Sequence, residues 1–362
     1  MPLTKTILVC PLNWGLGHAS RDIYIIRQLL RHGFRVIIGG DRSALFMLTS
    51  EFPGLPSVRI PDISIRYSRI LPAWLVVIFQ LPVIIAGIIR EHFLLVRIIR
   101  TTGADIILSD NRYGLWNRKV TSVLITHQLS PKLPAFLKIL ESFLSRLIRF
   151  MCKPFDYCWI PDIPDLVNLS GSLSSASGLS VKIRYTGILS RFMDIPVPIG
   201  QPDRPVLLII LSGPEPQRSL LQDIMITQVN RFPGRSLIVA GEPQKEYSSM
   251  ITRQCRMVSS LKTIDMLSSV HSARYIICRS GYSGIMDLVS LGKKALLIPT
   301  PGQTEQEYLA GYLESAGFYP FMKQQEFDIT SAVNILDSYP FKSINADNRF
   351  MDRILQELMT CP

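Results

Sequence analysis

Residues 278–299 read CRSGYSGIMDLVSLGKKALLIP, and this stretch decides the fold. An apolar run ending at Cys278 is followed by a turn of small residues, a short helix that stops at Gly292, and a second apolar run. A strand, a helix and a further strand in this order are typical of a parallel sheet with helices packed on it. The turn would present backbone N–H groups at the helix N-terminus, where phosphate groups can bind.

Polar side chains in and after this turn make it a candidate site for a nucleoside diphosphate. The turn itself consists of Arg279, Ser280, Gly281, Tyr282, Ser283 and Gly284. Asp287 lies about one turn into the helix and could accept hydrogen bonds from ribose hydroxyls. The polar loop 301–308 (PGQTEQEY) follows, in which Glu305 and Gln306 suit sugar hydroxyls. Either piece alone could be an ordinary strand-to-helix turn. Their succession within one unit is a more specific indication of a nucleotide-sugar site.

The same alternation of apolar runs and helical patterns extends over the whole chain. Strands are predicted at Ile7–Cys10, Arg35–Gly39, Ile106–Ser109, Val123–Thr126, Val206–Leu211, Ser236–Ala240, Tyr275–Cys278 and Ala295–Ile298. A Pro-rich stretch separates the two halves, which predicts an N-terminal domain over 1–191, a linker over 192–204 and a second domain over 205–345. A final helix over 346–362 is expected to pack back on the first domain. The fold class is therefore α/β, with two Rossmann-like, doubly wound domains facing a cleft.

A second glycine turn follows the first predicted strand, where residues 11–21 read PLNWGLGHASR. Gly15 and Gly17 allow a tight turn and close approach of a ligand to the backbone. His18 then stands near a helix N-terminus at the mouth of the cleft. The full G-x-G-x-x-G pattern of a nucleotide-phosphate turn is absent, with Arg21 in its last position. A helix-capping or packed histidine is the alternative interpretation of His18.

These motifs resemble the donor-binding signature of GT-B glycosyltransferases, above all the family that adds N-acetylglucosamine to the lipid-linked peptidoglycan precursor. The family's glycine turn ending in histidine matches Gly15–His18, and its RSG…E…G…P stretch matches 279–299 with Asp287 in place of glutamate. Its TG-x-x-x-R sequence matches Thr186–Arg191. Its second glycine loop matches Leu211–Pro216 in part, since Pro214 cannot supply an N–H.

The resemblance implies an inverting, metal-independent transfer of a sugar, expected to be N-acetylglucosamine, from a UDP-sugar. The residues expected to bind the donor are Gly17, Arg191, Ser212 and Gly213, together with residues 279–284, Asp287, Glu305 and Gln306. No D-x-D sequence and no metal-ligand spacing of His and Cys is present, so neither a metal nor another cofactor is expected.

Asp110 follows the predicted strand Ile106–Ser109 and should point into the same cleft as His18. Some GT-B enzymes that glycosylate hydroxyls pair a histidine base with such an aspartate, because the carboxylate orients the imidazole and stabilises the imidazolium. His18 and Asp110 are therefore the predicted catalytic pair. The equal alternative is that Asp110 only caps the segment that follows it. Thr126-His127-Gln128 resembles the family's acceptor-side H-E-Q corner. The predicted acceptor side consists of Asn13, Trp14, Asn111, Arg112, His127 and Gln128.

The charge distribution favours an anionic membrane surface as a partner. The chain has 39 Lys and Arg against 28 Asp and Glu, and residues 1–190 hold 22 and 11 of these, which is the whole excess of +11. Residues 70–89 carry no charge over a membrane-spanning length, but Pro72 and Pro82 interrupt them. A helix buried beneath the N-terminal domain or lying in the membrane interface is favoured over a true span.

Other features bound the location and the alternatives. The first residues do not resemble a secretory signal, so none is expected, and six scattered Cys without a CxxC pair are expected to be reduced thiols. A cytoplasmic enzyme, peripheral on the inner face of the plasma membrane and acting on a lipid-linked or glycan acceptor, is therefore expected. The alternatives are a sugar-nucleotide 2-epimerase of the same fold and a non-enzymatic basic nucleic-acid-binding protein. Nucleic acid is not an expected partner, because the surface aromatics and modules of such binding are missing.

Overall fold

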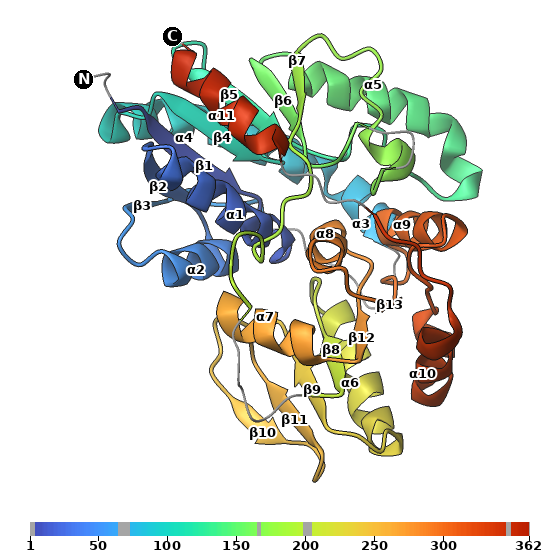
Figure 1. The fold of residues 1–362 in the computed structure, drawn as a ribbon. Helices are drawn as coiled ribbons and strands as arrows, with labels where there is room; N and C mark the ends of the chain where they lie inside the picture. The colour runs from blue at the N-terminus through green and yellow to red at the C-terminus, as the bar shows by residue number, and fades with distance from the viewer. Residues whose placement is uncertain (1–3, 64–72, 165–167, 198–204, 345–348, 362) are drawn as a thin grey trace.

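The computed structural model describes residues 4–63, 73–164, 168–197, 205–344 and 349–361, which fold around two sheets (Figure 1). The first sheet contains β1 (Thr6–Pro11), β2 (Arg35–Gly40), β3 (Ser57–Arg59), β4 (Ile106–Asp110), β5 (Thr121–Ile125), β6 (Tyr157–Ile160) and β7 (Lys182–Tyr185). Its order is β3-β2-β1-β4-β5-β6-β7, and every neighbouring pair is parallel.

Helices cover both faces of this sheet. They are α1 (Gly17–Arg31), α2 (Arg42–Glu51), α3 (Ala73–Phe79), α4 (Leu81–Thr102), α5 (Glu141–Cys152) and α11 (Arg349–Thr360), with 3₁₀ turns η1 (Ala135–Leu140) and η2 (Gly171–Ser174). β1 shows why both faces need cover. Ile7 and Val9 pack in one hydrophobic cluster with α1, whereas Leu8 and Cys10 pack in another with α4. Strands buried on both faces are continuous apolar runs, which is why their sequences stand out.

The second sheet repeats this architecture. It contains β8 (Leu207–Ile210), β9 (Ser236–Val239), β10 (Ser248–Met250), β11 (Cys255–Val258), β12 (Tyr275–Cys278) and β13 (Leu296–Leu297), in the order β10-β11-β9-β8-β12-β13. Only β10 runs antiparallel to its neighbour among the described strands. Its helices are α6 (Gln217–Gln228), α7 (Thr263–Ser272), α8 (Tyr282–Ser290), α9 (Thr304–Ser315) and α10 (Ile329–Ser338), with the 3₁₀ turns η3 (Val229–Arg231) and η4 (Gln324–Glu326). The predicted fold class is confirmed.

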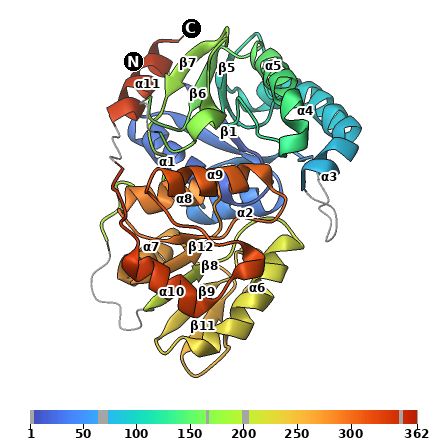
Figure 2. The same ribbon diagram turned by 90° about the vertical axis from the view of Figure 1, so that its right-hand side faces the viewer.

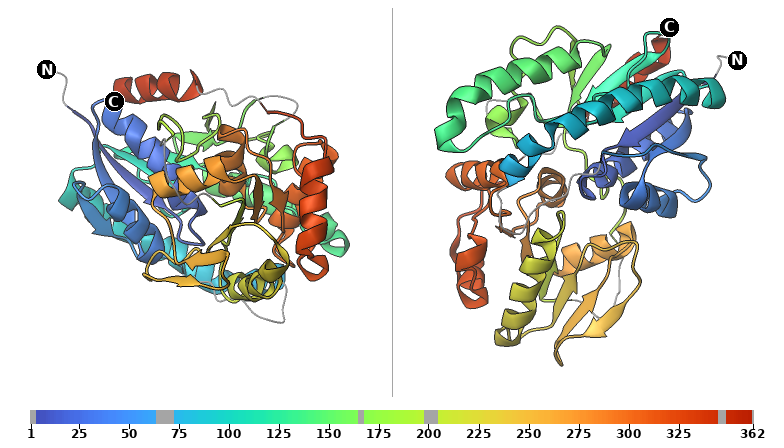
Figure 3. Two further views of the ribbon diagram at one scale, coloured as in Figure 1. Left: turned by 60° about the horizontal axis from the view of Figure 1, so that its bottom comes forward. Right: turned by 180° about the vertical axis from the view of Figure 1, so that it is seen from behind.

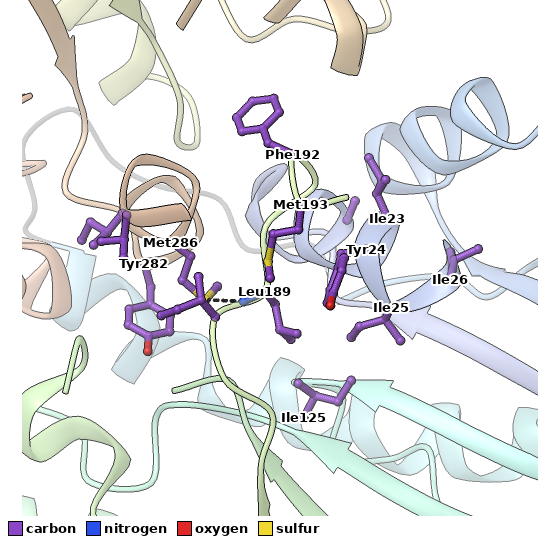
Figure 4. Close-up of a cluster of buried hydrophobic side chains, with 14 of the residues drawn as sticks. Ile23, Tyr24, Ile25, Ile26, Ile125, Leu189, Phe192, Met193, Tyr282 and Met286 are labelled. Atoms are coloured by element: carbon purple, nitrogen blue, oxygen red, sulfur yellow. Dashed lines mark hydrogen bonds between the residues drawn. The ribbon is translucent and has the colours of Figure 1, made fainter. Parts of the chain in front are cut away.

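One hydrophobic cluster runs from one domain into the other. It joins α1 and the first sheet to α7, α8 and the second sheet through the segment 188–193. Figure 4 shows Met286 and Tyr282 of α8 facing Leu189, whose backbone N–H lies 3.5 Å from the sulfur of Met286. This shared core holds the two sheets with their strand ends turned toward each other (Figure 2).

The topology places the glycine turns at the two switch points. In the first sheet the strand order reverses between β1 and β4, and in the second between β8 and β12. Ligands of doubly wound sheets bind beyond the carboxyl ends of the strands at such points. The turns after β1 and β12, and Asp110 at the end of β4, therefore lie where a ligand is expected.

The apolar stretch predicted over 70–89 forms two helices, α3 and the start of α4, with residues 70–72 outside the described ranges. The alternative of a helix buried beneath the domain is wrong. In α4 only Glu91, Leu95 and Ile98 are buried, on one face, while Val83, Ile85 and Phe93 are exposed. Within the part of the chain that the structure describes, no helix is both long and apolar enough to cross a membrane.

The last helix of the chain, α11, lies on the N-terminal domain (Figure 1). Arg184 of β7 makes two hydrogen bonds of 2.7 Å to the carboxylate of Glu357. Met351, Ile354, Leu355 and Leu358 are buried in the shared cluster. Residues 345–348, where the predicted helix began, and linker residues 198–204 lie outside the described ranges.

Candidate active site

Figure 3 shows the two domains from below and from behind, one on either side of α8. A cavity of about 770 Å³ opens between the domains. Sixteen of the predicted site residues line it: Trp14, Gly17, His18, His127, Gln128, Arg191, Ser212, Gly213, Arg279, Gly281, Tyr282, Ser283, Gly284, Asp287, Glu305 and Gln306. A smaller chamber of about 210 Å³ continues from it past Trp14 and Gly213, and Asn13 lines this chamber. The two motifs that the sequence places 260 residues apart thus meet in one cleft.

The N-termini of α1 and α8 face each other across this cleft. A Cβ atom added to Gly17 would lie 3.1 Å from Oγ of Ser283, so a side chain at this position would crowd the start of α8. Helix N-termini carry unsatisfied N–H groups and a partial positive charge. A diphosphate bound in the cavity beside both helix starts would therefore meet donors from both domains.

His18 and Asp110 are in direct contact. Nδ1 of His18 lies 2.9 Å from Oδ1 of Asp110, and the histidine side chain is 17% exposed whereas the carboxylate is fully buried. Burial alone would oppose ionisation of Asp110, but the charges and hydrogen bonds of Arg21 and His18 hold its pKa well below its ordinary range. An ionised carboxylate therefore orients the one imidazole that faces the cleft from the start of α1.

Arg21 is a site residue that the sequence analysis did not identify as functional. Its side chain is 1% exposed and its Nε donates to Oδ2 of Asp110 at 2.7 Å, while one Nη also binds Oδ1. His18 and Arg21 are three residues apart on a helix, a spacing that places two side chains on the same face. That spacing was the available signal, but the residue was read as a departure from a glycine motif.

Asp287 faces the end of the N-terminal domain. Its Oδ1 accepts a hydrogen bond of 2.6 Å from Oγ of Ser190, and its Oδ2 lies 3.4 Å from Nε of Arg191. Burial raises the pKa of Asp287, against the opposing effects of Arg191 and Ser190. The predicted ribose-binding carboxylate and the predicted donor arginine are thus neighbours across the domain boundary.

Glu305 also reaches the opposite domain. Its Oε1 lies 2.8 Å from Nε2 of His127, and its Oε2 accepts a hydrogen bond from the side-chain amide of Gln128. The ring of His127 stacks on Tyr282 with centroids 4.1 Å apart, and the Tyr282 hydroxyl donates to the carbonyl of Pro161 at 2.7 Å. These contacts place Glu305, His127 and Gln128 in one wall of the cleft.

The structure corrects the placement of two predicted acceptor-side residues, which do not line the cleft. Arg112 is buried, donates to Glu91 of α4 at 2.8 Å and binds the carbonyls of Ile60 and Pro61. Asn111 has a positive φ of 59° and accepts a hydrogen bond from the hydroxyl of Thr126. Both side chains serve the local packing after β4, because the chain turns away from the cleft directly after Asp110.

Three donor-side residues also have local roles. Ser280 is buried and donates to the carbonyl of Gln306, and the Gln306 side chain accepts from the backbone of Thr300. Arg279 lines the cavity, but its guanidinium binds the carbonyls of Gln217, Ile298 and Pro299, and burial lowers its pKa to about 10. These side chains shape the turns rather than offer free groups to a ligand.

Further lining residues come from loops without a motif. The segment 259–263 before α7 lines the C-terminal side, and Phe46, Met47 and Ser50 of α2 line the opposite side. The structure describes no group of three or more His, Cys, Asp or Glu within its resolved ranges that could hold a metal ion.

Two Rossmann-like domains with a ligand cleft between their strand ends define the GT-B class of glycosyltransferases. The glycosyltransferase of kitacinnamycin superposes with a TM-score of 0.63 over 99% of this chain and 95% of that chain, at 13% identity. A Listeria monocytogenes protein named as a UDP-N-acetylglucosamine 2-epimerase superposes with a TM-score of 0.59 over 97% and 95%, also at 13% identity. At such identities these likenesses establish the fold alone.

The sequence relatives establish the enzyme class. Residues 239–347 match the glycosyltransferase family 28 C-terminal domain. The UDP-N-acetylglucosamine–N-acetylmuramyl-(pentapeptide) pyrophosphoryl-undecaprenol N-acetylglucosamine transferase of Haemophilus ducreyi is 20% identical over 92% of this chain and 89% of its own length. An uncharacterized glycosyltransferase of Methanosarcina acetivorans is 24% identical over 86% and 83%. The protein is therefore a GT-B glycosyltransferase similar to the peptidoglycan-precursor enzymes, which sets aside the non-enzymatic alternative.

Proposed function

We propose that this glycosyltransferase moves a sugar, expected to be N-acetylglucosamine, from a UDP-sugar to a lipid-linked or glycan acceptor at the inner face of the plasma membrane. The observation that carries the proposal is the cleft itself, with the α8 N-terminus and Asp287 on one side and the His18–Asp110 pair on the other. The name of the Haemophilus ducreyi relative supports both the donor and a polyprenyl diphosphate acceptor.

The proposed reaction is a single displacement with inversion. His18 takes the proton of the acceptor hydroxyl on Nε2, the acceptor oxygen bonds to the anomeric carbon, and the bond from that carbon to the phosphate oxygen breaks. UDP leaves with the bonding electrons, its charge met by the α8 N–H groups and by Arg191. No metal or other cofactor has a part in this proposal.

A donor screen tests the nucleotide. Thermal shifts with UDP-, GDP- and TDP-sugars should single out a UDP-sugar, because a ligand at 100 times its Kd stabilises the folded state by about 2.7 kcal/mol. Product analysis separates the two enzyme classes that share the fold. A transferase retains the sugar until an acceptor is supplied, whereas a 2-epimerase releases the epimerised sugar from the donor alone.

Replacing Asp287 by alanine should weaken UDP binding by about 1.5–3 kcal/mol, the range for a hydrogen bond to a charged group. The expected loss arises because the carboxylate would no longer accept from the ribose hydroxyls. Isothermal calorimetry with UDP measures it directly. The variant Ser190→Ala is the matched control, since it breaks the same 2.6 Å contact between the domains but keeps the carboxylate. Equal losses in both variants would mean that Asp287 only joins the domains.

An apolar surface on the N-terminal domain supports the membrane part of the proposal. Its exposed members are Ile78, Phe79, Leu81, Val83, Ile85, Ile89, Phe93, Phe136, Ile139, Leu140, Phe143, Leu147 and Phe150. They lie on α3, α4, η1 and α5, which occupy one side of the domain (Figure 2). Trp74 and Phe136, with ring centroids 5.5 Å apart, join α3 to η1. Exposed basic residues flank this surface, among them Arg90, Lys138 and Arg146. Such a combination suits the interface of an anionic bilayer.

The double substitution Ile139→Glu and Phe143→Glu should abolish flotation of the protein with anionic liposomes. Ile139 is 87% and Phe143 59% exposed, so the change should spare the fold while placing two charges against the lipid. Binding by the wild type should rise with anionic lipid and fall with salt, since each basic residue near the surface contributes about 1 kcal/mol.

The control is Met250→Glu, an equally exposed apolar position on β10 of the other domain. Equal recovery of the wild type with neutral and anionic vesicles would contradict the electrostatic contribution. Resistance to carbonate extraction would instead indicate a membrane span.

A further inference from the structure

Arg21 occupies the centre of a polar network that links both domains. Its guanidinium makes a two-point contact with Asp110, through Nε to Oδ2 at 2.7 Å and through Nη2 to Oδ1. The same Nη2 lies 2.9 Å from Nδ1 of His18, and Nη1 lies 3.5 Å from Nδ1 of His127. A buried arginine thus contacts both members of the predicted catalytic pair and also His127 on the acceptor side.

The contacts of His127 determine which of its nitrogens carries the proton. A guanidinium has only donors, and an ionised carboxylate has only acceptors. Nδ1 of His127 faces Arg21, and its Nε2 faces Glu305 at 2.8 Å. The proton therefore sits on Nε2. Burial lowers the pKa of His127, and although Glu305 opposes this, the charges of Arg21 and His18 add to it, so the ring is neutral.

His18 presents the opposite arrangement. Its Nδ1 lies 2.9 Å from both Oδ1 of Asp110 and Nη2 of Arg21. One proton of Nη2 is donated to Oδ1 of Asp110, while the other faces Nδ1 of His18. A bare Nδ1 would set its lone pair against the Asp110 anion, and a base that acts through Nε2 needs its proton on Nδ1, where Asp110 accepts it. The proposed role of His18 therefore assigns the proton to Nδ1 and leaves the lone pair on Nε2. Among the described residues none hydrogen-bonds this second nitrogen.

We propose that Arg21 is a positioning residue that neutralises Asp110 beside His18, so that the histidine works next to an ion pair of zero net charge. This inference rests on the proposed role of His18 as the base. A lone carboxylate would favour the imidazolium and make His18 too readily protonated at neutral pH. The Arg21 cation opposes that effect, keeps Nε2 free to accept a proton, and holds the carboxylate in the plane that orients Nδ1–H.

The other charges around His18 do not replace this effect. Besides Arg21 on α1 and Asp110 on β4, the titratable groups that act on His18 are His127 after β5 and Glu305 on α9. His127 is neutral, and Glu305 is hydrogen-bonded to it and to Gln128. Asp22, next in sequence to Arg21, is fully buried beside Asp110, and its burial together with the charge of Asp110 raises its pKa well above its ordinary value. Arg21 is therefore the one cation in contact with the pair among these groups.

The test is NMR of the histidine imidazoles in the intact protein as a function of pH, with His18→Gln used for assignment. In the wild type we expect the proton on Nδ1 of His18 and on Nε2 of His127. In Arg21→Gln, which can still donate to Asp110 but has no charge, the pKa of His18 should rise by about one to three units. In Arg21→Lys, which keeps the charge, it should rise less.

Arg27→Gln is the matched control. Arg27 is on the same helix but is paired with Glu51, so this variant should leave the NMR titration of His18 unchanged.

An unchanged His18 pKa in a folded Arg21→Gln variant would overturn the inference. So would a wild-type His18 with its proton on Nε2, an observation that needs no variant. Turnover provides a separate readout, because the acid limb of the kcat profile should move to higher pH with the His18 pKa. If the acid limb of the kcat profile does not move when the NMR titration of His18 does, His18 is not the base, and the effect of Arg21 on His18 still stands.

Discussion

Replacing His18 by alanine should lower kcat by about 10²–10⁴-fold and leave the Kd for the UDP-sugar nearly unchanged. The base acts on the acceptor hydroxyl, whereas the donor is held by the α8 turn and Asp287 on the other domain. An imidazole titrates near neutrality, so it can take a hydroxyl proton without large tuning of its pKa. Steady-state turnover and calorimetry with UDP separate the two effects.

His271→Ala is the matched control, because this histidine is exposed at the end of α7. Asp110→Asn should reduce kcat less than His18→Ala, through loss of orientation rather than of the base. Donor binding must be checked in this variant, since Asn cannot neutralise the buried Arg21. Near-normal turnover in His18→Ala with none in Asp110→Asn would make the carboxylate the base. Full activity in both would refute the pair and make His127 the next candidate.

The strands that carry the site were predictable because they are buried on both faces. β1, β4, β8 and β12 are apolar runs at the centres of their sheets, and all four were predicted within a residue or two of the observed bounds. β3, β6, β7, β10 and β11 were missed. β3, β7 and β10 lie at sheet edges and are largely exposed or half-buried, so their sequences lack the continuous apolar pattern. β6 and β11 are mostly buried, but each has only four residues.

Proximity in the site was predictable where topology alone determines it. His18 after β1 and Asp110 at the end of β4 meet because adjacent parallel strands end at the same edge of a sheet. Arg112 was misplaced for the opposite reason. The Arg112 side chain points toward Glu91, which is 21 residues away on α4. No local sequence pattern predicts an ion pair between residues so far apart. The contacts of Glu305 with His127 and Gln128 join the two domains and could not be predicted from the sequence for the same reason.

Helices α3 and α4 are a second case in which the sequence left the surroundings of a segment open. The composition of residues 70–89 indicated contact with an apolar medium, but both a buried helix and an interfacial helix satisfy it. The structure decides between burial and exposure through a few contacts late in α4, where Glu91, Leu95 and Ile98 turn inward at helical spacing. The apolar residues that precede them are thereby left on the outside.

Replacing Glu91 by leucine should lower the free energy of unfolding by about 3–5 kcal/mol, the range for breaking a buried ion pair. Leucine fills a similar volume, so the loss comes from a buried Arg112 guanidinium left with the carbonyls of Ile60 and Pro61 and the charge of nearby Asp62. Arginine cannot escape by losing its proton, whereas a carboxyl can gain one. Burial already raises the pKa of Glu91 against the opposing charge of Arg112, so Arg112→Met should cost less.

Urea denaturation of the two single variants and of the double variant Glu91→Leu/Arg112→Met measures these differences. The double variant should recover much of the loss, because two apolar side chains leave no unpaired charge. Glu326→Ala is the matched control. It breaks the Lys323–Glu326 pair, whose side chains are both 64% exposed, and should hardly change the midpoint. Equal effects of Glu91→Leu and Glu326→Ala would refute a structural role for the buried pair. Since the pair ties α4 to the turn after β4 and to the segment after β3, a large effect would also explain what holds the apolar surface in place beside the cleft.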